Sequence, residues 1–370
     1  MKIGIEAQRI FRKNKHGMDY VVLEEIKVLQ MIDKENEYYI FVRPGEDRCV
    51  SSTPNFHVVE LRCPTYPLWE QVALPLAVKS HHIDLLHCTS NTAPLYCPVK
   101  LVLTLHDIIF LEKRDKSNHS LYQNMGWIYR RLIVPRILRH CKSIITVSDY
   151  ERKNIISRLS LPEELVVRIY NGYNVWFNRH DTEEKNYLRY IDQKGYFFFF
   201  GNTDPKKNTE RTIRAYARYL KQSGQKRRLL LADFSKTHLE EILHRYNIET
   251  AGQYITVTDY IVNKDLPSVY HAAFAVLYTS LRESFGIPLL EAMACGTPVV
   301  TSNTSSMPEI GGKQAALVNP YQIEDITKMM LRLEQDNTFY ARQKSWGLER
   351  ARIFSWEKTG HELLDLYKRL

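Results

Sequence analysis

The 370-residue sequence lacks the paired cysteines of a zinc site. Its six cysteines are scattered, and no Cys-x-x-Cys occurs. Structural zinc sites take closely spaced cysteine and histidine pairs, so none is predicted. No run approaches the about 20 apolar residues that span a bilayer. The charged Lys2 and Glu6 come too early for a signal peptide, and the sequence therefore predicts a cytoplasmic protein with reduced thiols.

Several signatures of common enzyme classes are also absent. The sequence has no Gly-x-Gly-x-x-Gly fingerprint, no P-loop and no Gly-x-Ser-x-Gly nucleophile elbow. Their absence argues against dehydrogenases, kinases and hydrolases. No Asp-x-Asp occurs either, so the usual carboxylate clamp for Mg²⁺ or Mn²⁺ on a diphosphate is missing.

Acidic residues are scarce in one segment. The net charge is +9, and Lys113–Lys142 has eight Lys or Arg against one Asp, which is +7. Arg130 and Arg131 lie here among apolar residues, a pattern that suits a helix on an anionic membrane surface. We expect Pro135 to interrupt that helix. A solvated basic helix remains the alternative; nucleic acid is not expected as a partner, because no recognised nucleic-acid-binding module is present.

Short β-type runs alternate with helical segments along the chain, which predicts two doubly wound α/β domains with mostly parallel sheets. Expected helices include Leu68–Ser80, Ser120–Arg139 and Ile287–Ala294. We expect an acceptor-binding domain over 1–172, a linker over 173–194 and a nucleotide-sugar domain over 195–352. A closing helix over 353–370 follows, with a return to the first domain as one option. Ligands of such folds bind at the carboxyl ends of the strands.

Residues 283–291 combine a turn, a helix start and two carboxylates. Ser284 and Gly286 precede an apolar helical run, and the free N–H groups near Phe285–Ile287 favour a phosphate. A carboxylate can accept hydrogen bonds from two vicinal hydroxyls. Glu283 and Glu291 therefore suit the sugar and the ribose at the two ends of a sugar nucleotide. A loop Glu and a helix Glu without such a role are the alternative.

The order Glu283-x7-Glu291, then Gly296-Thr297-Pro298 and Pro308-Glu309, resembles the donor-site signature of family 4 glycosyltransferases. The family's usual Glu-Gly-Phe-Gly has Ser284 in place of its first Gly. The resemblance extends from about Lys2 to the C-terminal helix. It implies the GT-B fold, in which two Rossmann-like domains face each other across a crevice. It also implies retention of the anomeric configuration and no required metal or other cofactor.

Other segments carry the same resemblance. Gly201–Asn208 is similar to the family's diphosphate loop, which assigns the leaving diphosphate to Lys207 with Lys206 beside it. Asn202 stands where some members have an additional Arg. The loop with Tyr260 and Ile261 corresponds to a segment near the nucleobase.

In the first domain, Thr104-Leu105-His106-Asp107 matches the family's Thr-x-His-Asp and ends an apolar strand. The resemblance implies that His106 positions donor and acceptor. A structural His bonded to a backbone carbonyl is the alternative. Gly17 corresponds to a glycine-rich loop that approaches the diphosphate.

The predicted activity is transfer of a hexose from a nucleoside diphosphate sugar to a glycan or lipid-linked glycan. GDP-mannose is the first expected donor and a UDP-hexose the second. A sugar-nucleotide epimerase or phosphorylase of the same fold and a non-catalytic binding subunit remain alternatives.

Overall fold

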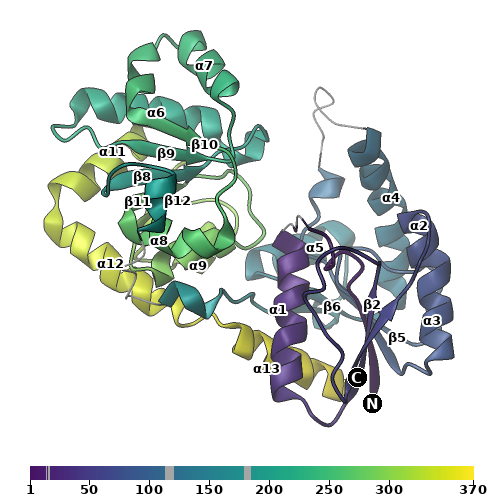
Figure 1. Ribbon diagram of the computed structural model, residues 1–370. Coiled ribbons are helices and arrows are strands. Elements are labelled where there is room, and N and C mark those ends of the chain that lie inside the picture. The colour runs from purple at the N-terminus through teal and green to yellow at the C-terminus, as the bar shows by residue number, and fades with distance from the viewer. Residues whose placement is uncertain (14, 16, 113–120, 179–184) are drawn as a thin grey trace. The chain divides into compact units, whose positions relative to one another are not determined.

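The computed structural model describes residues 1–13, 15, 17–112, 121–178 and 185–370, and of 121–123 it describes the backbone alone. The chain divides into two compact units. Unit 1 comprises Met1–Gly172 and Trp356–Leu370, and unit 2 comprises Tyr173–Ser355 (Figure 1). The described part of the expected linker therefore lies within unit 2. The C-terminal helix α13 (Trp356–Arg369) lies within unit 1.

Unit 1 is built on a seven-stranded parallel sheet with the strand order β3-β2-β1-β4-β5-β6-β7. The strands are β1 (Lys2–Glu6), β2 (Glu37–Val42), β3 (Phe56–Glu60), β4 (Leu85–Cys88), β5 (Lys100–Thr104), β6 (Cys141–Thr146) and β7 (Val166–Arg168). The helices are α1 (Gly17–Ile32), α2 (Tyr66–Leu68), α3 (Leu74–Ser80), α4 (Leu121–Ile137), α5 (Asp149–Leu159) and α13.

Alternation along the strands gives unit 1 two apolar layers. Ile3 and Ile5 belong to a buried cluster with α1 and α13. Leu101 and Leu103 belong to a second cluster with α3, α4 and α5. The hydroxyl of Tyr367 lies 2.6 Å from Nδ1 of His87, so α13 is joined to the centre of this sheet.

Unit 2 has a six-stranded parallel sheet with the order β10-β9-β8-β11-β12-β13. The strands are β8 (Tyr196–Phe200), β9 (Leu229–Ala232), β10 (Ile255–Thr258), β11 (Ala273–Tyr278), β12 (Val299–Ser302) and β13 (Ala316–Val318). The helices are α6 (Thr209–Gln222), α7 (Lys236–Arg245), α8 (Leu266–Ala272), α9 (Ile287–Ala294), α10 (Met307–Gly311), α11 (Ile323–Gln335) and α12 (Asn337–Ala351).

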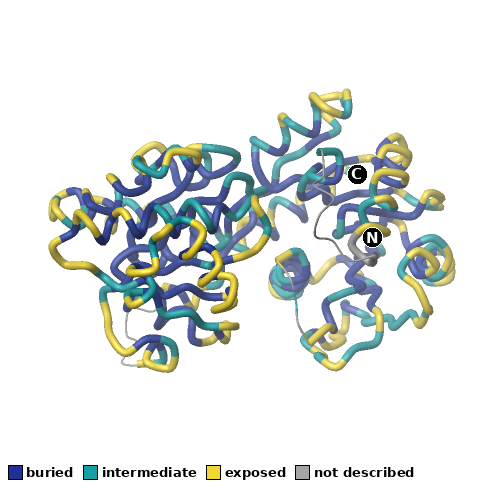
Figure 2. Tube along the Cα trace, turned by 90° about the horizontal axis from the view of Figure 1, so that it is seen from above, coloured by how far each residue is buried: buried dark blue, intermediate teal, exposed yellow. Residues whose placement is uncertain are grey.

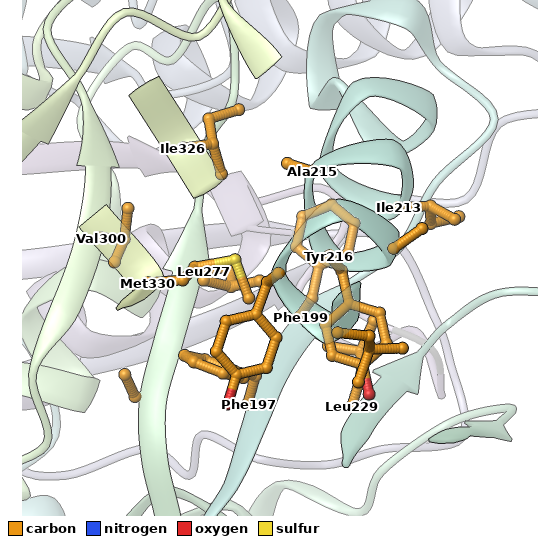
Figure 3. Close-up of a cluster of buried hydrophobic side chains, with 14 of the residues drawn as sticks. Phe197, Phe199, Ile213, Ala215, Tyr216, Leu229, Leu277, Val300, Ile326 and Met330 are labelled. Carbon is orange, nitrogen blue, oxygen red and sulfur yellow. The ribbon is translucent and has the colours of Figure 1, made fainter. Parts of the chain in front are cut away.

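The all-apolar strand β8 explains how this sheet is covered on both faces. Phe197 and Phe199 pack with Tyr216 of α6 and Met330 of α11 in the cluster drawn in Figure 3. Phe198, between them, packs edge to face with Tyr270 of α8. Figure 2 shows the buried segments, in dark blue, running through the interior of each unit. All the strand pairings within the two sheets are parallel, which confirms two doubly wound α/β units.

One expectation about helices was wrong. Pro135 does not interrupt its helix, because α4 continues through it to Ile137. Pro135 lies in the last turn, so the hydrogen bond that its missing N–H removes, and any bend at its ring, fall within two residues of the helix end. The expected helix over Leu68–Ser80 is present, as a continuous run of α2, a π-turn η1 (Trp69–Ala73) and α3.

Candidate functional site

Three loops of unit 2 follow neighbouring strands and lie at one edge of its sheet. They come after β8, β11 and β12, which are adjacent in the strand order. The first carries Lys207 and the second carries Glu283. The third, over 303–306, leads into α10. The carboxyl ends of parallel strands meet at this edge, where α/β folds bind their ligands.

The loop after β8 is held rigidly. Oδ1 of Asp204 accepts a hydrogen bond from the Lys206 N–H (3.0 Å) at the start of the turn η7 (Pro205–Lys207). Asn208 follows with φ +60° and donates from Nδ2 to the backbone oxygens of Thr279 (3.0 Å) and Pro320 (2.8 Å). These bonds fix the backbone on both sides of Lys207.

Lys207 and Glu283 form an ion pair at the junction of two loops. Nζ of Lys207 lies 2.7 Å from Oε1 of Glu283, and the two side chains are 31% and 14% exposed. An ammonium group has three protons. Lys207 can therefore orient Glu283 with one proton and still offer others to a phosphate oxygen.

The backbone around Glu283 is fixed by the loop after β12. Oγ of Ser305 accepts a hydrogen bond from the Glu283 N–H (3.1 Å). Oγ of Ser306 donates to the backbone oxygen of Glu283 (2.9 Å) and lies 3.1 Å from that of Phe285. The hydroxyl of Tyr278, at the end of β11, hydrogen-bonds the Glu283 carboxylate. Burial, followed by the charge of Glu283, raises the pKa of Tyr278 well above its usual range, so it remains a donor.

Gly286 is the N-cap of α9 and adopts φ +108°, a backbone conformation that residues other than glycine rarely adopt. A Cβ at this position would lie 2.8 Å from Cε of Met307 and 3.3 Å from Cε1 of Tyr278. No side chain caps the helix. Pro288 has no N–H, and the Leu289 N–H already donates to the backbone oxygen of Gly286 (3.1 Å). The backbone at Gly286 and Ile287 is therefore the part of the helix start that can face an anion. Ser284 lies just before this turn, and Phe285 packs edge to face with Phe354.

Glu291 lies in the second turn of α9 and accepts a hydrogen bond from Tyr270 of α8 (3.2 Å). Burial raises the pKa of Glu291 to about 7. The charge of Glu291 adds to that of Glu283 in raising the pKa of Tyr278. The two glutamates thus belong to one electrostatic cluster.

The remaining donor-site residues predicted in unit 2 lie in the loops after β8 and β10. Asn202 is exposed, and its Oδ1 accepts from the Asp204 N–H (2.8 Å). Lys206 lies 3.3 Å from Asp204. The loop after β10, the edge strand, has an exposed Tyr260 and a buried Ile261. A nucleobase there would meet the ring of Tyr260 rather than the side chain of Ile261.

His106 lies in unit 1, just beyond the end of β5. Its Nε2 lies 3.0 Å from the backbone oxygen of Thr89, and its N–H donates to Oδ1 of Asn91 (2.6 Å). Burial lowers the pKa of His106, which favours the neutral ring. A neutral ring that donates from Nε2 leaves Nδ1 as an acceptor for a hydroxyl. His106 therefore makes the backbone-carbonyl contact expected of a structural histidine. That contact leaves its other ring nitrogen able to bind a ligand.

The other predictions in unit 1 concern Gly17 and the basic segment. Gly17 begins α1, and a Cβ there would meet nothing within 4 Å, so packing alone does not require glycine. Of Lys113–Lys142, residues 113–120 lie outside the described residues. Arg131 is exposed with its guanidinium 4.5 Å from the Trp127 ring centroid, whereas Arg130 is partly buried.

Comparison with known families accounts for most of both units. The model described as Glycosyltransferase Family 4 matches residues 21–177, and the model described as Glycosyl transferases group 1 matches residues 181–350. The chain belongs to the family 4 glycosyltransferases. The cluster around Glu283, Lys207 and Glu291 lies within the second match.

Curated relatives of this family 4 chain include bacterial mannosyltransferases. The O-antigen chain mannosyltransferase B of Escherichia coli is 30% identical over 236 residues, which cover 63% of this chain and 62% of that protein. The serotype-specific mannosyltransferase WbdA of Escherichia coli is 28% identical over 290 residues, which cover 74% of this chain and 34% of that protein. The matches thus span less than two thirds of either relative.

Solved structures show the same GT-B fold. The sucrose-phosphate synthase of Thermosynechococcus elongatus superimposes with a TM-score of 0.76 at 19% identity, covering 100% of this chain and 98% of that one. HepE of Anabaena, solved with UDP and glucose, gives a TM-score of 0.73 at 17% identity, with 100% of both chains covered.

Sequence reasoning about this family 4 chain missed the polar groups that hold the glutamates. Tyr278, Ser305 and Ser306 contact the Glu283 segment, and Tyr270 contacts Glu291. Tyr278 is a polar residue that ends an otherwise apolar strand, and that position is a signal that the sequence reasoning did not use. The serines give no comparable signal, because their role depends on the pairing of β11 with β12.

Neither a membrane span nor a metal cluster was found in the part of the chain that the structure describes. There, no helix is both long and apolar enough to cross a bilayer. The same residues include no group of three or more His, Cys, Asp or Glu side chains placed to hold a metal ion.

Proposed function

We propose that this family 4 member transfers a hexose from a nucleoside diphosphate sugar to a hydroxyl of a glycan or lipid-linked glycan. One observation carries the proposal: Lys207 and Glu283 are paired beside the uncapped N-terminus of α9. That arrangement offers a cation and the positive end of a helix for a diphosphate, and a carboxylate for sugar hydroxyls.

In the proposed reaction, Lys207 and the first turn of α9 stabilise the leaving diphosphate. Lys206 adds charge nearby. Glu283 accepts hydrogen bonds from the donor sugar and stabilises positive charge as it develops at the anomeric carbon. Glu291 holds the ribose, and His106 of unit 1 positions donor and acceptor. We propose that no metal or other cofactor takes part, because Lys207 and the helix N-terminus supply the positive potential.

We further propose that the anomeric configuration is retained, with attack on the face from which the diphosphate leaves. Support comes from the family resemblance. The leaving phosphate itself takes the proton of the attacking hydroxyl, so the proposal requires no enzymic nucleophile. Proton nuclear magnetic resonance of the product, recorded before mutarotation, distinguishes retention from inversion.

GDP-mannose is the donor that we propose first, because relatives over both units carry the name mannosyltransferase. A UDP-hexose is the second candidate, since HepE was solved with UDP and glucose. We propose cell-surface polysaccharide synthesis as the setting, with the protein on the cytoplasmic side and peripheral to the membrane.

A thermal-shift panel of GDP, UDP, GDP-mannose and UDP-glucose tests the donor proposal. Stabilisation by GDP and GDP-mannose, with little effect of the uridine compounds, is expected. Selective stabilisation by UDP and UDP-glucose would favour the second candidate. Release of free nucleotide only when an acceptor glycan is present would separate a transferase from an epimerase or a silent binding subunit.

A further inference from the structure

Unit 1 exposes large apolar side chains on two neighbouring segments that also contribute to its core. We call these residues the apolar ridge: Leu68, Val72, Leu76, Met125, Ile128 and Leu132. Each is between 47% and 69% exposed. Apolar side chains gathered on one surface mark an interaction site more often than scattered ones do.

The ridge follows from the spacing of its residues. Met125, Ile128 and Leu132 lie three and four positions apart, so they share one face of α4. Val134 and Ile137, on another face of α4, are buried in the unit 1 core. The helix therefore carries large apolar side chains toward both the core and the solvent. A soluble helix normally keeps its outer face polar.

The first half of the ridge repeats this pattern. Leu68, Val72 and Leu76 lie four residues apart along α2, the π-turn η1 and α3. Trp69 and Leu74, between them, are fully buried. Both halves of the ridge are thus outer faces of segments whose inner faces form the core.

Hydrogen bonds join the two halves. Tyr129 of α4 donates to Glu70 (2.5 Å) and accepts from Nε2 of Gln71 (2.8 Å), both in η1. Oε1 of Gln71 accepts from the Leu95 N–H (2.8 Å), and Leu95 and Tyr96 are also exposed. Figure 1 shows α2, α3 and α4 side by side in unit 1. The ridge and the Leu95 loop therefore belong to one surface.

The charge on this surface has one sign. The sequence has no Asp or Glu over 85–105 or over 121–148, and Glu70 alone over 62–83. Glu70 is fully buried and is held by Tyr66, Thr92 and Tyr129. The exposed cations in these segments include Lys79, Arg131, Arg136 and Arg139.

We propose that the apolar ridge, with Arg131, Arg136, Arg139 and Lys79, docks on an anionic lipid bilayer. The apolar side chains enter the boundary between headgroups and acyl chains, and the cations meet lipid phosphates. Arg131, stacked on Trp127, keeps its charge at the level where headgroups lie. This inference deepens the proposed function, and rests on it, in that a lipid-linked acceptor lies in the same membrane.

A second copy of the chain fits the surface less well than a bilayer does. A two-fold interface places the same patch on both partners. The cations of this surface would then oppose cations, with no exposed carboxylate in the segments 62–83, 85–105 or 124–148 to pair with them. A nucleic acid would use the cations but leave the ridge uncovered.

Co-sedimentation of the full chain with vesicles tests the proposal. One set is phosphatidylcholine alone, and the other contains about one third phosphatidylglycerol. Binding to the anionic set is expected. The triple variant Arg131→Gln, Arg136→Gln, Arg139→Gln should bind about a hundredfold more weakly, since each cation near an anionic surface is worth roughly fivefold in partitioning. Met125→Ser, Ile128→Ser, Leu132→Ser should abolish binding.

The matched control is Val175→Ser with Trp176→Ser, which removes two exposed apolar side chains of unit 2. It should bind vesicles as the parent chain does. Equal binding of the parent to neutral and anionic vesicles, or equal loss in control and ridge variants, would overturn the proposal. So would a concentration-dependent dimer that the ridge variant abolishes, because that result assigns the surface to a second copy.

Nucleotide stabilisation measured on the same variants separates this proposal from the proposed function. The ridge and control variants should retain the parent's thermal shift with GDP or UDP, which also shows that they fold. Loss of vesicle binding with nucleotide binding intact supports the membrane face alone. Vesicle binding by a chain that no nucleotide stabilises would contradict the proposed function and leave the membrane face standing.

Discussion

The paired charges of Lys207 and Glu283 are the residue-scale feature on which the proposed chemistry depends. Glu283 is held by Lys207, by Tyr278 and through its backbone by Ser305 and Ser306. A carboxylate held by two side chains on a fixed backbone loses little freedom when a sugar binds. Electrostatic groups that are already in position contribute more to catalysis than groups that must reorganise.

Replacing Glu283 by Gln tests this role. The amide retains the shape but removes the negative charge that stabilises the transition state. We expect turnover to fall by roughly a hundredfold or more, with a smaller change in the affinity for the donor. Initial rates at saturating donor measure the effect. Undiminished turnover would refute the role assigned to Glu283.

Glu291 should make the folded chain less stable as the pH rises toward neutrality. Its pKa is raised to about 7 by burial, from an ordinary value of 4.5. The folded chain therefore holds this proton more tightly than the unfolded chain does. The stability that the proton contributes is present below pH 4.5 and is lost as the pH rises to about 7.

The variant Glu291→Gln has no titrating group at this position, so its stability should not fall in this way as the pH rises. Between the two pH values the unfolding free energy of the parent should fall relative to the variant by at most about 3.5 kcal/mol, at about 1.4 kcal/mol per pKa unit. Denaturant titrations across that range measure the difference. Parallel pH profiles for the two proteins would show that Glu291 is not the buried acid described above.

At the scale of elements, the turn into α9 combines two requirements. Gly286 must adopt a positive φ, and it must leave room for Met307 and Tyr278. Gly17, the other predicted donor glycine, meets neither requirement, since a Cβ there would lie in open space. The two glycines therefore form a matched pair for separating folding from ligand contact.

Gly286→Ala should lower the unfolding free energy by roughly 1–3 kcal/mol and weaken nucleotide binding, because the strained backbone displaces the first turn of α9. Gly17→Ala should leave stability within about 0.5 kcal/mol of the parent. If Gly17 approaches the donor, the same variant should still reduce transfer. Thermal melts with and without nucleotide distinguish the two effects; a stable Gly286→Ala chain would contradict the backbone strain.

Much of the element order could be predicted from the sequence. Runs such as 196–200 are apolar without interruption, and buried parallel strands produce that pattern. Pro135 misled the prediction, because only two helical residues follow it, and the place where the helix ends is decided by other residues. Tyr270 and Tyr278 gained their roles only from the packing of α8 and β11 around the glutamates, which local sequence does not encode.

At the scale of the whole molecule, the C-terminal helix belongs to the unit that contains the N-terminus. Leu363 of α13 is fully buried in the unit 1 core, and Tyr367 contacts His87. Oγ1 of Thr359 donates to the backbone oxygen of Tyr170 (2.7 Å). The chain therefore contributes both of its ends to one core.

Leu363→Ala should destabilise unit 1 by roughly 2–5 kcal/mol, the usual cost of such a cavity. Because unit 2 has its own core, amide hydrogen exchange should quicken in β1, β4 and α1 and change little in β8 and β11. Mass spectrometry of peptides from both units measures this difference. Uniform loss of protection across the chain would show that the units do not unfold separately.

The central claim, that the loops after β8, β11 and β12 hold a nucleoside diphosphate sugar, can be tested directly by calorimetry. GDP, UDP and their hexose conjugates are titrated into the parent chain, Lys207→Ala and Lys221→Ala. Lys221 is an exposed lysine in the last turn of α6 and serves as the matched control. We predict that one nucleotide binds the parent and Lys221→Ala equally, and Lys207→Ala at least about tenfold more weakly, the cost of one charge-assisted hydrogen bond. Equal binding by Lys207→Ala, or no binding of any of these ligands to the parent, would contradict the account.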